Sequence, residues 1–330
     1  MVETKSMNMP KVSVIVPVYG VENYIERCAR SLFEQTLGDI EYLFIDDCTP
    51  DNSIDVLKRV LKDYPLRENQ VKIFKMSQNS GQAKVRKFGI SQVTGEFTIH
   101  CDSDDWIDTC LYEKLYNKAK SEDADIVIHP FIETDGNKQS QLALYPYGNL
   151  EHPSNKMYTW ENEGSLCNKL IKTTLYNSGI IYPQDNMGED MCLIYQLIYF
   201  ANKISIVDNV YYYIYRNPIS ITRTPTQTNI YRNFLQGCNN CRIVEKFYKQ
   251  HNAIDRDTRK SLIRLKYSKR EILRPIVGIR KYHKIWCKTF PEIDKGIFTD
   301  SALTFREKLK SLCIRFRLFP FPWSKCIYKE

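Results

Sequence analysis

Residues 12–47 read VSVIVPVYGVENYIERCARSLFEQTLGDIEYLFIDD, and this stretch decides the fold. The β-branched run at 12–18 predicts a strand that ends at the Tyr19-Gly20 turn. Apolar residues then recur at helical spacing over 25–33, which predicts a helix. Residues 40–45, apolar except at Glu41, predict a second strand. A strand, a helix and a strand in this order are typical of a parallel βαβ unit.

The same alternation continues to about residue 130. We expect further strands at 71–74, 97–101 and 126–129, and further helices around 54–61, 84–87 and 111–120. The sequence therefore predicts an α/β fold with a mostly parallel sheet sandwiched by helices. The periodicity fades over 131–160. Beyond it we expect a helix that opens at Glu189-Asp190, an aromatic strand at 211–215, and helices at 229–249, 258–274 and 302–317.

The composition is that of a globular protein of about two domains. The chain has 330 residues, of which 43% are hydrophobic and 26% charged. No apolar stretch reaches the ~18 residues that span a bilayer, and the N-terminus lacks the pattern of a secretory signal. The eleven cysteines show no regular framework. Because such a chain needs no disulfides to fold, we expect a reducing compartment and a cytoplasmic location.

The charge is distributed unevenly along the chain. The net charge is +8, but residues 255–330 hold 20 Lys and Arg against 8 Asp and Glu, a net of +12. The first 254 residues therefore carry a net charge of −4, which is +8 minus +12. A basic C-terminal region on an acidic body indicates a polyanionic partner, either nucleic acid or an anionic membrane.

The sharpest feature is Asp102-Ser103-Asp104-Asp105, directly after an expected strand. Three carboxylates within four residues repel one another unless a cation lies among them. Mg²⁺ is commonly held by one or two carboxylates together with the phosphates of a substrate. The alternative is that Asp104 or Asp105 only caps the following helix. Because ligands of parallel sheets bind beyond the carboxyl ends of the strands, Tyr19, Asp46 and Asp47 are expected around the same crevice.

Three further groups of residues are candidates for chemistry. Asp46 and Asp47 can accept hydrogen bonds from a base or a ribose, or can merely cap a turn. Lys84 and Arg86 follow the Ser80-Gly81 turn and can meet a phosphate, or can lie on a solvated helix face. Glu189-Asp190 follows Gly188; it can supply a general base, or can simply suit the dipole of a helix N-terminus.

Several common catalytic motifs are missing. The first expected strand is not followed by G-x-G-x-x-G, and the chain has no G-K-[ST] loop, no H-E-x-x-H and no G-x-S-x-G. The sequence therefore disfavours dinucleotide-dependent oxidoreduction, P-loop hydrolysis, zinc proteolysis and α/β-hydrolase chemistry. Nucleotidyl transfer is disfavoured as well, because Tyr19-Gly20-Val21-Glu22 is not a basic, Gly-rich loop.

These motifs, taken together, resemble those of the family 2 glycosyltransferases with the GT-A fold, of the kind that makes bacterial capsule, O-antigen and exopolysaccharide. The resemblance covers residues 11 to about 222. It rests on Val14-Ile15-Val16-Pro17-Val18-Tyr19, Gln35-Thr36, Ile45-Asp46-Asp47, Asn79-Ser80-Gly81 with Arg86 and Gly89, Asp102-Ser103-Asp104-Asp105, Asn168-Lys169-Leu170, Gly188-Glu189-Asp190, and Tyr213-Ile214-Tyr215-Arg216. Singly these motifs are weak, but their common order and spacing make them specific.

The resemblance implies an inverting, metal-dependent transfer of a sugar from a nucleotide-diphosphate donor, often UDP-linked, to a hydroxyl of a glycan or lipid-linked acceptor. It implies the following roles: Pro17, Tyr19, Glu22, Asp46, Arg86 and Asp102 bind the donor, Asp104 binds Mg²⁺ or Mn²⁺, Asp190 is the catalytic base, and Asp105, Glu189 and Lys169 support the site. The implied domains are a catalytic domain over 1–222 and a basic helical region over 223–330. Val85, Lys87 and Gly20 depart from the residues that the family commonly has at these positions.

The basic C-terminal region allows two interpretations. Cations and aromatics interleave over 305–328, which suits the interface of an anionic bilayer. We therefore expect peripheral attachment to the inner face of the cell membrane and no nucleic-acid binding; a basic helix packed on the catalytic domain is the alternative. The competing function is a non-catalytic sugar-nucleotide-fold binding module with a basic nucleic-acid- or membrane-binding tail. It would show no metal-dependent turnover.

Overall fold

The computed structural model describes residues 9–136, 139–142, 150–151, 164–216, 226–295 and 303–318. Within these ranges the chain forms two compact units. Unit 1 comprises the described residues up to 154, together with 165–182 and 200–218; unit 2 comprises the described residues of 183–199 and those from 226 on, together with Gly164. The functional division into 1–222 and 223–330 stays a prediction.

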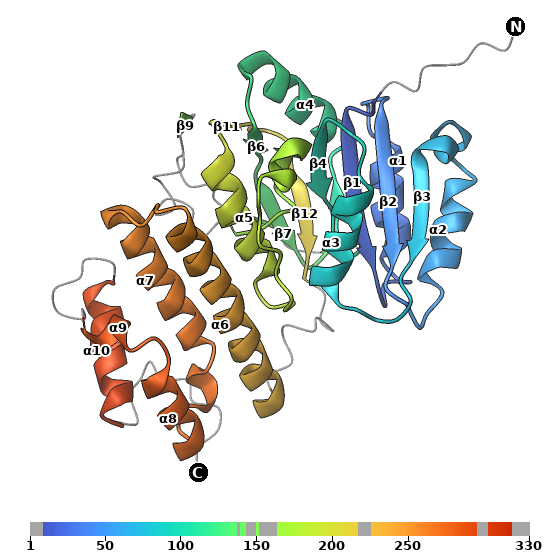
Figure 1. Cartoon of the computed structure of the whole chain (residues 1–330). Coiled ribbons are helices and arrows are strands. Elements are labelled where there is room, and N and C mark those ends of the chain that lie inside the picture. Colours follow the sequence, from blue (N-terminus) through green and yellow to red (C-terminus); the bar gives the residue numbers. More distant parts are fainter. Residues whose placement is uncertain are drawn as a thin grey trace, which may run out of the picture. The chain divides into compact units, whose positions relative to one another are not determined.

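Unit 1 is built on a sheet that has eight strands in the described part of the chain (Figure 1). Their order is β3 (Val71–Lys75), β2 (Ile40–Asp46), β1 (Val12–Val18), β4 (Phe97–His100), β10 (Lys169–Lys172), β6 (Ile126–Ile128), β11 (Lys203–Ile206) and β9 (Leu150–Glu151). The pairs β3–β2, β2–β1, β1–β4 and β6–β11 are parallel. The mostly parallel α/β fold is thereby confirmed. The predicted strands are all present, but β9, β10 and β11 were not predicted. β10 separates β4 from β6 by pairing antiparallel with both.

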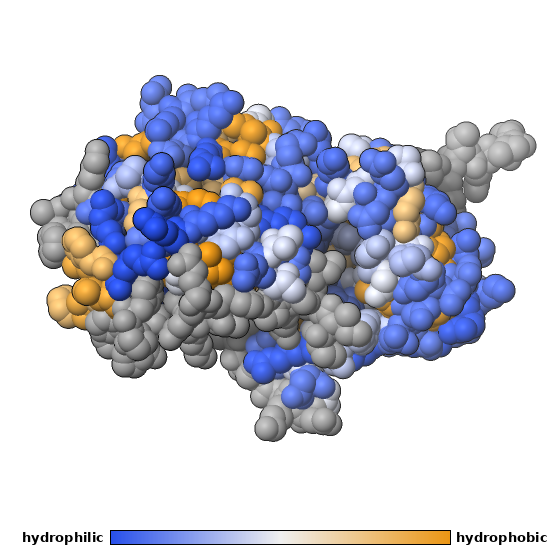
Figure 2. All heavy atoms as spheres, turned by 90° about the horizontal axis from the view of Figure 1, so that it is seen from below, coloured by the Kyte–Doolittle hydropathy of each residue, from blue (hydrophilic) through white to orange (hydrophobic). Residues whose placement is uncertain are grey.

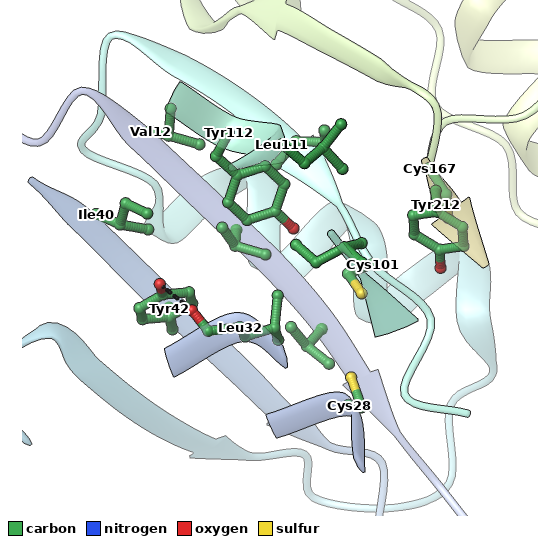
Figure 3. Close-up of a cluster of buried hydrophobic side chains, with 14 of the residues drawn as sticks. Val12, Cys28, Leu32, Ile40, Tyr42, Cys101, Leu111, Tyr112, Cys167 and Tyr212 are labelled. Atoms are coloured by element: carbon green, nitrogen blue, oxygen red, sulfur yellow. Dashed lines mark hydrogen bonds between the residues drawn. The ribbon is translucent and has the colours of Figure 1, made fainter. Parts of the chain in front are cut away.

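Helices cover both faces of this sheet. They are α1 (Ile25–Phe33), α2 (Ser53–Leu61), α3 (Gln82–Gln92) and α4 (Leu111–Glu122). Figure 3 shows the core on one face, where Leu32 of α1 lies against Tyr42 of β2; Cys28 of α1 and Tyr112 of α4 belong to the same cluster. The Tyr42 hydroxyl donates to the Leu32 carbonyl at 2.5 Å, so the buried phenol is satisfied.

The other face of the sheet receives α3 at a glycine. A Cβ at Gly89 would lie 2.6 Å from Ile15 and 2.8 Å from Ile45, so only glycine lets the helix approach this closely. Every residue of β2 is buried, including the charged Glu41 and Asp46.

A second, smaller sheet in unit 1 has the order β5 (Trp106–Ile107), β12 (Tyr212–Tyr215), β7 (Phe131–Thr134) and β8 (Gln139–Leu142). The predicted aromatic strand is β12, whereas β5, β7 and β8 were not predicted. Because β5 begins directly after Asp105 and pairs with β12, this sheet fixes the far end of the aspartate cluster.

Unit 2 is helical. It contains α5 (Glu189–Phe200) up to Tyr199, α6 (Gln227–Gln250), α7 (Arg256–Glu271), α8 (Arg280–Lys288), α9 (Glu292–Lys295) and α10 (Phe305–Arg315). Short 3₁₀ turns occur at Pro65–Gln70 and Thr173–Asn177 in unit 1 and at Arg274–Ile276 here. The three C-terminal helices predicted from the periodicity correspond to α6, α7 and α10, so the helical C-terminal region is confirmed.

Part of the basic charge of unit 2 is neutralised internally. Arg270 is fully buried and binds Asp294 through two parallel hydrogen bonds of 2.9 Å, with its guanidinium 4.0 Å from the centre of the Trp286 ring. Arg315 of α10 binds the same carboxylate at 2.8 Å. Two cations on the one carboxylate of Asp294 therefore join α7, α9 and α10. Figure 2 shows that one face of the molecule is largely hydrophilic, with separate hydrophobic patches.

Glu41 of β2 carries a prediction about stability. Its carboxylate is almost fully buried and accepts hydrogen bonds from Ser13, Thr94 and Gly95, with an ion pair to Lys72 at 2.9 Å. Burial alone would raise its pKa, but the hydrogen bonds from Ser13, Thr94 and Lys72 outweigh burial and lower it. We expect Glu41→Gln to reduce the free energy of unfolding by about 2–3 kcal/mol at pH 7, measured by urea denaturation.

The pH dependence of that loss follows from the lowered pKa. Glu41 stabilises the fold fully above the pKa of the unfolded chain, and this contribution is lost as the pH falls through the lower pKa of the folded state. The difference in the free energy of unfolding between wild type and Glu41→Gln should therefore become smaller below about pH 4. Glu26→Gln is the control, because Glu26 pairs with Arg30 and Arg59 at the surface, and its loss should cost under about 0.5 kcal/mol. A difference that stays constant down to pH 3 would contradict this role of Glu41.

Candidate active site

The ends of three parallel strands bring the predicted residues of unit 1 to one edge of the sheet. Val18 at the end of β1 lies opposite Asp46 at the end of β2. On the other side of β1, the Cys101 amide donates to the Ile15 carbonyl at 3.0 Å, so the chain after β4 leaves at the same edge. Tyr19, Asp46 and the aspartate cluster thus follow neighbouring strand ends, as the sequence predicted.

Asp46 and Asp47 differ in what their carboxylates hold. Both oxygens of Asp47 accept backbone hydrogen bonds, from Ser80 at 2.7 Å and from Gly81 at 2.9 Å, so Asp47 anchors the turn that starts α3. Asp46 accepts one bond at Oδ1, from the Thr49 amide at 2.7 Å. Its Oδ2 makes no hydrogen bond to any described residue, and it is the oxygen that remains for a ligand.

The other donor-binding candidates lie around the loop after β1. Tyr19 is 42% exposed, and Pro17 is a residue of β1 opposite Ile45. The Glu22 carboxylate accepts two hydrogen bonds of 3.1 Å from Asn52, one from its backbone and one from its side chain. Glu22 therefore holds the start of α2 in this structure, and its role toward a donor stays a prediction.

The buried Arg86 forms an ion pair with the partly exposed Asp102. Arg86 is fully buried on α3, and its Nη2 donates to Asp102 Oδ1 at 2.9 Å, while the Gln82 amide lies 3.2 Å from the same oxygen. The Asp102 side chain is 35% exposed, so the carboxylate spans from a buried cation to the surface. Arg86, which the sequence predicted could meet a phosphate, thus orients the carboxylate of Asp102.

Asp105 is fixed by the small sheet. Its buried carboxylate accepts a hydrogen bond from the Tyr212 hydroxyl at 2.8 Å and one from the Tyr215 amide at 2.7 Å. The same hydroxyl accepts the Asp102 amide at 2.9 Å, so one phenol joins both ends of the cluster. Burial, followed by the charges of Asp104 and Asp102, raises the pKa of Asp105 well above its usual range. Through these two hydrogen bonds Asp105 ties the cluster to the small sheet.

Arg27 is a residue of this site that sequence reasoning missed. Its Nη2 donates to the Asp104 carbonyl at 3.0 Å, and its guanidinium lies 3.6 Å from the ring centre of Trp106 and 4.8 Å from that of Tyr215. Burial lowers the pKa of Arg27, and the nearby Tyr215 and aspartates oppose that shift. The aromatic strand was visible in the sequence, but nothing local marked Arg27.

The remaining candidates have different surroundings. Lys169 is fully buried in β10, where its ammonium donates to the Ser165 carbonyl at 2.8 Å and to Asn168 Oδ1 at 2.7 Å. Glu189 and Asp190 lie in unit 2, in the first turn of α5, after Gly188 with its φ of 77°. Acidic residues in that turn are favoured by the helix dipole. Their roles in catalysis stay predictions.

The donor set fits a divalent cation shared with a substrate. The described residues contain no group of three His, Cys, Asp or Glu that could hold a metal by itself. Asp104 is half-buried and Asp102 is partly exposed, so the cluster supplies two hard oxygen donors at the strand edge. Mg²⁺ needs no more protein ligands than these when phosphates complete its shell.

Sequence comparison agrees with this arrangement. Residues 13–174 match the profile described as Glycosyl transferase family 2. The chain contains a family 2 glycosyltransferase domain. The resemblance to the type that makes bacterial polysaccharides is thereby confirmed.

Two curated relatives show how far the similarity extends. The glycosyltransferase is 26% identical over 322 residues to glycosyltransferase GlyG of Streptococcus pneumoniae, covering 93% of this chain and 95% of that protein. It is 30% identical over 216 residues to the cholesterol galactosyltransferase of Borreliella burgdorferi, covering 61% of this chain and 59% of the relative.

Solved structures support the GT-A fold. TarS residues 1–349 of S. aureus, in complex with UDP-GlcNAc, superpose with a TM-score of 0.61 at 17% identity, over 93% of this chain and 88% of that one. The mannosyltransferase PcManGT of Pyrobaculum calidifontis, in complex with GDP-Man and Mn²⁺, gives a TM-score of 0.53 at 12% identity, over 96% and 84%. At these identities the likeness concerns the fold.

Proposed function

We propose that this glycosyltransferase moves a sugar from a nucleotide-diphosphate donor, UDP-linked in our proposal, to a hydroxyl of a glycan or lipid-linked oligosaccharide in cell-surface polysaccharide synthesis. The observation that carries the proposal is the aspartate loop at the shared strand edge, with Asp102 held by Arg86 at 2.9 Å and Asp104 half-buried beside it. A loop tied down by Arg27, Arg86 and Tyr212 is preorganised, as a site that meets a diphosphate must be.

On the donor side, Asp46 Oδ2 has the free acceptor capacity to bind a base or a ribose hydroxyl. Tyr19 is exposed enough to lie against a base, and Pro17 and Glu22 shape the same strand edge. Asp102 meets the ribose or the metal, with Arg86 fixing its orientation from the interior. TarS binds UDP-GlcNAc and PcManGT binds GDP-Man, so GT-A sites of this kind accept different nucleotides.

In this proposal Asp104, assisted by Asp102, would bind the cation, Mg²⁺ or Mn²⁺. When bound, the ion neutralises negative charge on the diphosphate as the nucleotide leaves. On the acceptor side, Asp190 takes the proton of the attacking hydroxyl, which makes the oxygen a better nucleophile. Attack from the face opposite the leaving nucleotide inverts the anomeric configuration.

The proposal is tested by a donor screen. A panel of UDP-, GDP- and dTDP-sugars is incubated with the full chain and Mg²⁺ or Mn²⁺, and nucleotide release is measured with and without EDTA. We expect release from at least one UDP-sugar and its loss on chelation. Release that is insensitive to EDTA would contradict the metal dependence, and turnover with only GDP- or dTDP-sugars would contradict the UDP assignment. A product with the donor's anomeric configuration would contradict inversion.

The same screen separates the competing function. A non-catalytic binding module with a basic tail would show no nucleotide release with any donor, and it would bind nucleic acid or anionic membranes with a steep dependence on salt. No observation in the structure favours it over catalysis.

We also propose attachment at the inner face of the cell membrane. No helix within the described ranges is long and apolar enough to cross a bilayer. At the C-terminal end of α10, however, Phe316 is 67% exposed and Leu318 55% exposed, with Arg315 and Arg317 exposed between and beside them. Apolar side chains flanked by cations suit the headgroup region of an anionic membrane. Residues 319–328 of the predicted segment lie outside the described residues.

This attachment predicts an effect of two substitutions. The double variant Phe316→Ser/Leu318→Ser should lose at least about half of its binding to phosphatidylserine-containing vesicles, because each exposed apolar side chain contributes on the order of 1 kcal/mol when buried. The measurement is vesicle flotation. Leu66→Ser is the control, since Leu66 is 92% exposed in unit 1. Equal flotation of both variants and the wild type would end the proposal.

A further inference from the structure

The loop before α5 is held by side chains of α6. The Met187 amide donates to Gln236 Oε1 at 3.3 Å, and the Met187 carbonyl accepts a hydrogen bond from Asn240 Nδ2 at 3.0 Å. The same amide nitrogen of Asn240 donates to the Asp185 carbonyl at 2.8 Å. Gln236 and Asn240 are four residues apart, so they lie on one face of the helix. Both backbone polar groups of Met187, its N–H and its C=O, are thus hydrogen-bonded to side chains of α6.

The burial of Asn240 makes its hydrogen bonds to the loop costly to break. Its side chain is fully buried, whereas the neighbouring Asn239 is exposed; it donates to the side chain of Asp185 at 3.1 Å and accepts from Arg242 at 3.1 Å. If the Asn240 side chain moved away, its amide and the carbonyls of Asp185 and Met187 would lose their hydrogen bonds. Each buried polar group left without a partner costs on the order of 1–3 kcal/mol.

Further along, α6 and α5 remain in contact. The buried Tyr248 hydroxyl donates to the Tyr195 carbonyl at 2.8 Å, and Tyr199 meets the rings of Phe247 and Tyr248. The helix that begins with Glu189 and Asp190 is therefore fixed to α6 at two places, its preceding loop and its body. Gly188 sits between Met187 and Asp190 at a φ of 77°, so the position of that loop sets where α5 starts.

We propose that Asn240 is a positioning residue for Asp190: it fixes the loop at Asp185–Met187 and thereby the first turn of α5. The inference rests on the proposed function, in which Asp190 is the base. It gives the C-terminal helical region a part in the chemistry, because α6 carries the group that places the base. A displacement of about 1 Å in such a group can cost on the order of 100-fold in rate.

The test compares two buried side chains of α6. Asn240→Leu removes the donor to both loop carbonyls, and Tyr248→Phe removes a donor to a carbonyl of the α5 body. We expect both variants to lose similar thermal stability. Only Asn240→Leu should lower kcat, by about 10- to 100-fold, with the KM for the best donor of the panel and the affinity for UDP with Mn²⁺ within twofold of wild type. Asn239→Ala, the exposed neighbour, should behave as wild type.

A second readout does not depend on activity. Amide hydrogen exchange over residues 185–192 should be faster in Asn240→Leu and unchanged in Tyr248→Phe. If Asn240→Leu does not fold, Asn240→Ser, which keeps a polar group but is too short to reach both carbonyls, takes its place. The proposal is overturned if exchange at 185–192 is unchanged, or if kcat falls equally in Asn240→Leu and Tyr248→Phe. If exchange at 185–192 is faster in Asn240→Leu but Asp190→Asn keeps full turnover, Asn240 does hold the loop, and Asp190 is not the base.

Discussion

Asp104→Ala should lower turnover by at least about 1,000-fold while the chain stays folded, because a cation that neutralises the diphosphate is worth several kcal/mol at the transition state. The Asp104 backbone is held by Arg27 through its carbonyl, which the substitution leaves in place, so the loop should keep its shape. The measurements are turnover of the best donor and calorimetric binding of UDP with and without Mn²⁺. The variant should bind UDP nearly equally in both conditions.

Asp39→Ala is the control that distinguishes loss of the metal ligand from loss of a negative charge in general. Asp39→Ala also removes one negative charge, but Asp39 lies directly before β2, at the opposite end of the sheet, and pairs with Lys11 at the surface. It should retain turnover within about twofold, as exposed ion pairs contribute little. Turnover of Asp104→Ala within tenfold of wild type, with the Mn²⁺ response intact, would refute Asp104 as the metal ligand.

Asp190→Asn should reduce kcat by about 100- to 10,000-fold, because a positioned general base contributes that much and an amide cannot take a proton. The KM for the donor and the affinity for UDP with Mn²⁺ should change little, since the lost step concerns the acceptor hydroxyl. Steady-state kinetics with a hydroxyl acceptor measure both parameters, and a thermal melt checks the fold.

Asp185→Asn is the matched control for that change. It removes a carboxylate in the same loop, where one oxygen of Asp185 accepts only the exposed Asn239 amide, and kcat should stay within about threefold. A loss of donor affinity in Asp190→Asn as large as its loss of kcat would assign Asp190 to donor binding instead.

The candidate site was partly predictable. Residues directly after a strand, such as Tyr19, Asp46 and Asp104, could be assigned to one edge because parallel strands end together. The partners of these residues could not. Arg27 and Tyr212 reach the loop from positions 77 residues before Asp104 and 110 residues after Asp102, and no local pattern links such distant groups. The same holds for Asn240, which is 53 residues from Met187.

By itself the sequence determined the fold class and, for the first 130 residues, the order of the helices and of the strands of the main sheet. These follow from periodicities of two and 3.6, which record whether each short segment is covered on one side or on both. The tertiary structure alone decided that β10 pairs antiparallel between β4 and β6. It also decided that Asp105 and Arg86 hold the loop at residues 102–105 in place. Local patterns fix which face of a segment is buried, whereas the choice of neighbour depends on the competing free energies of pairings between segments far apart in the chain.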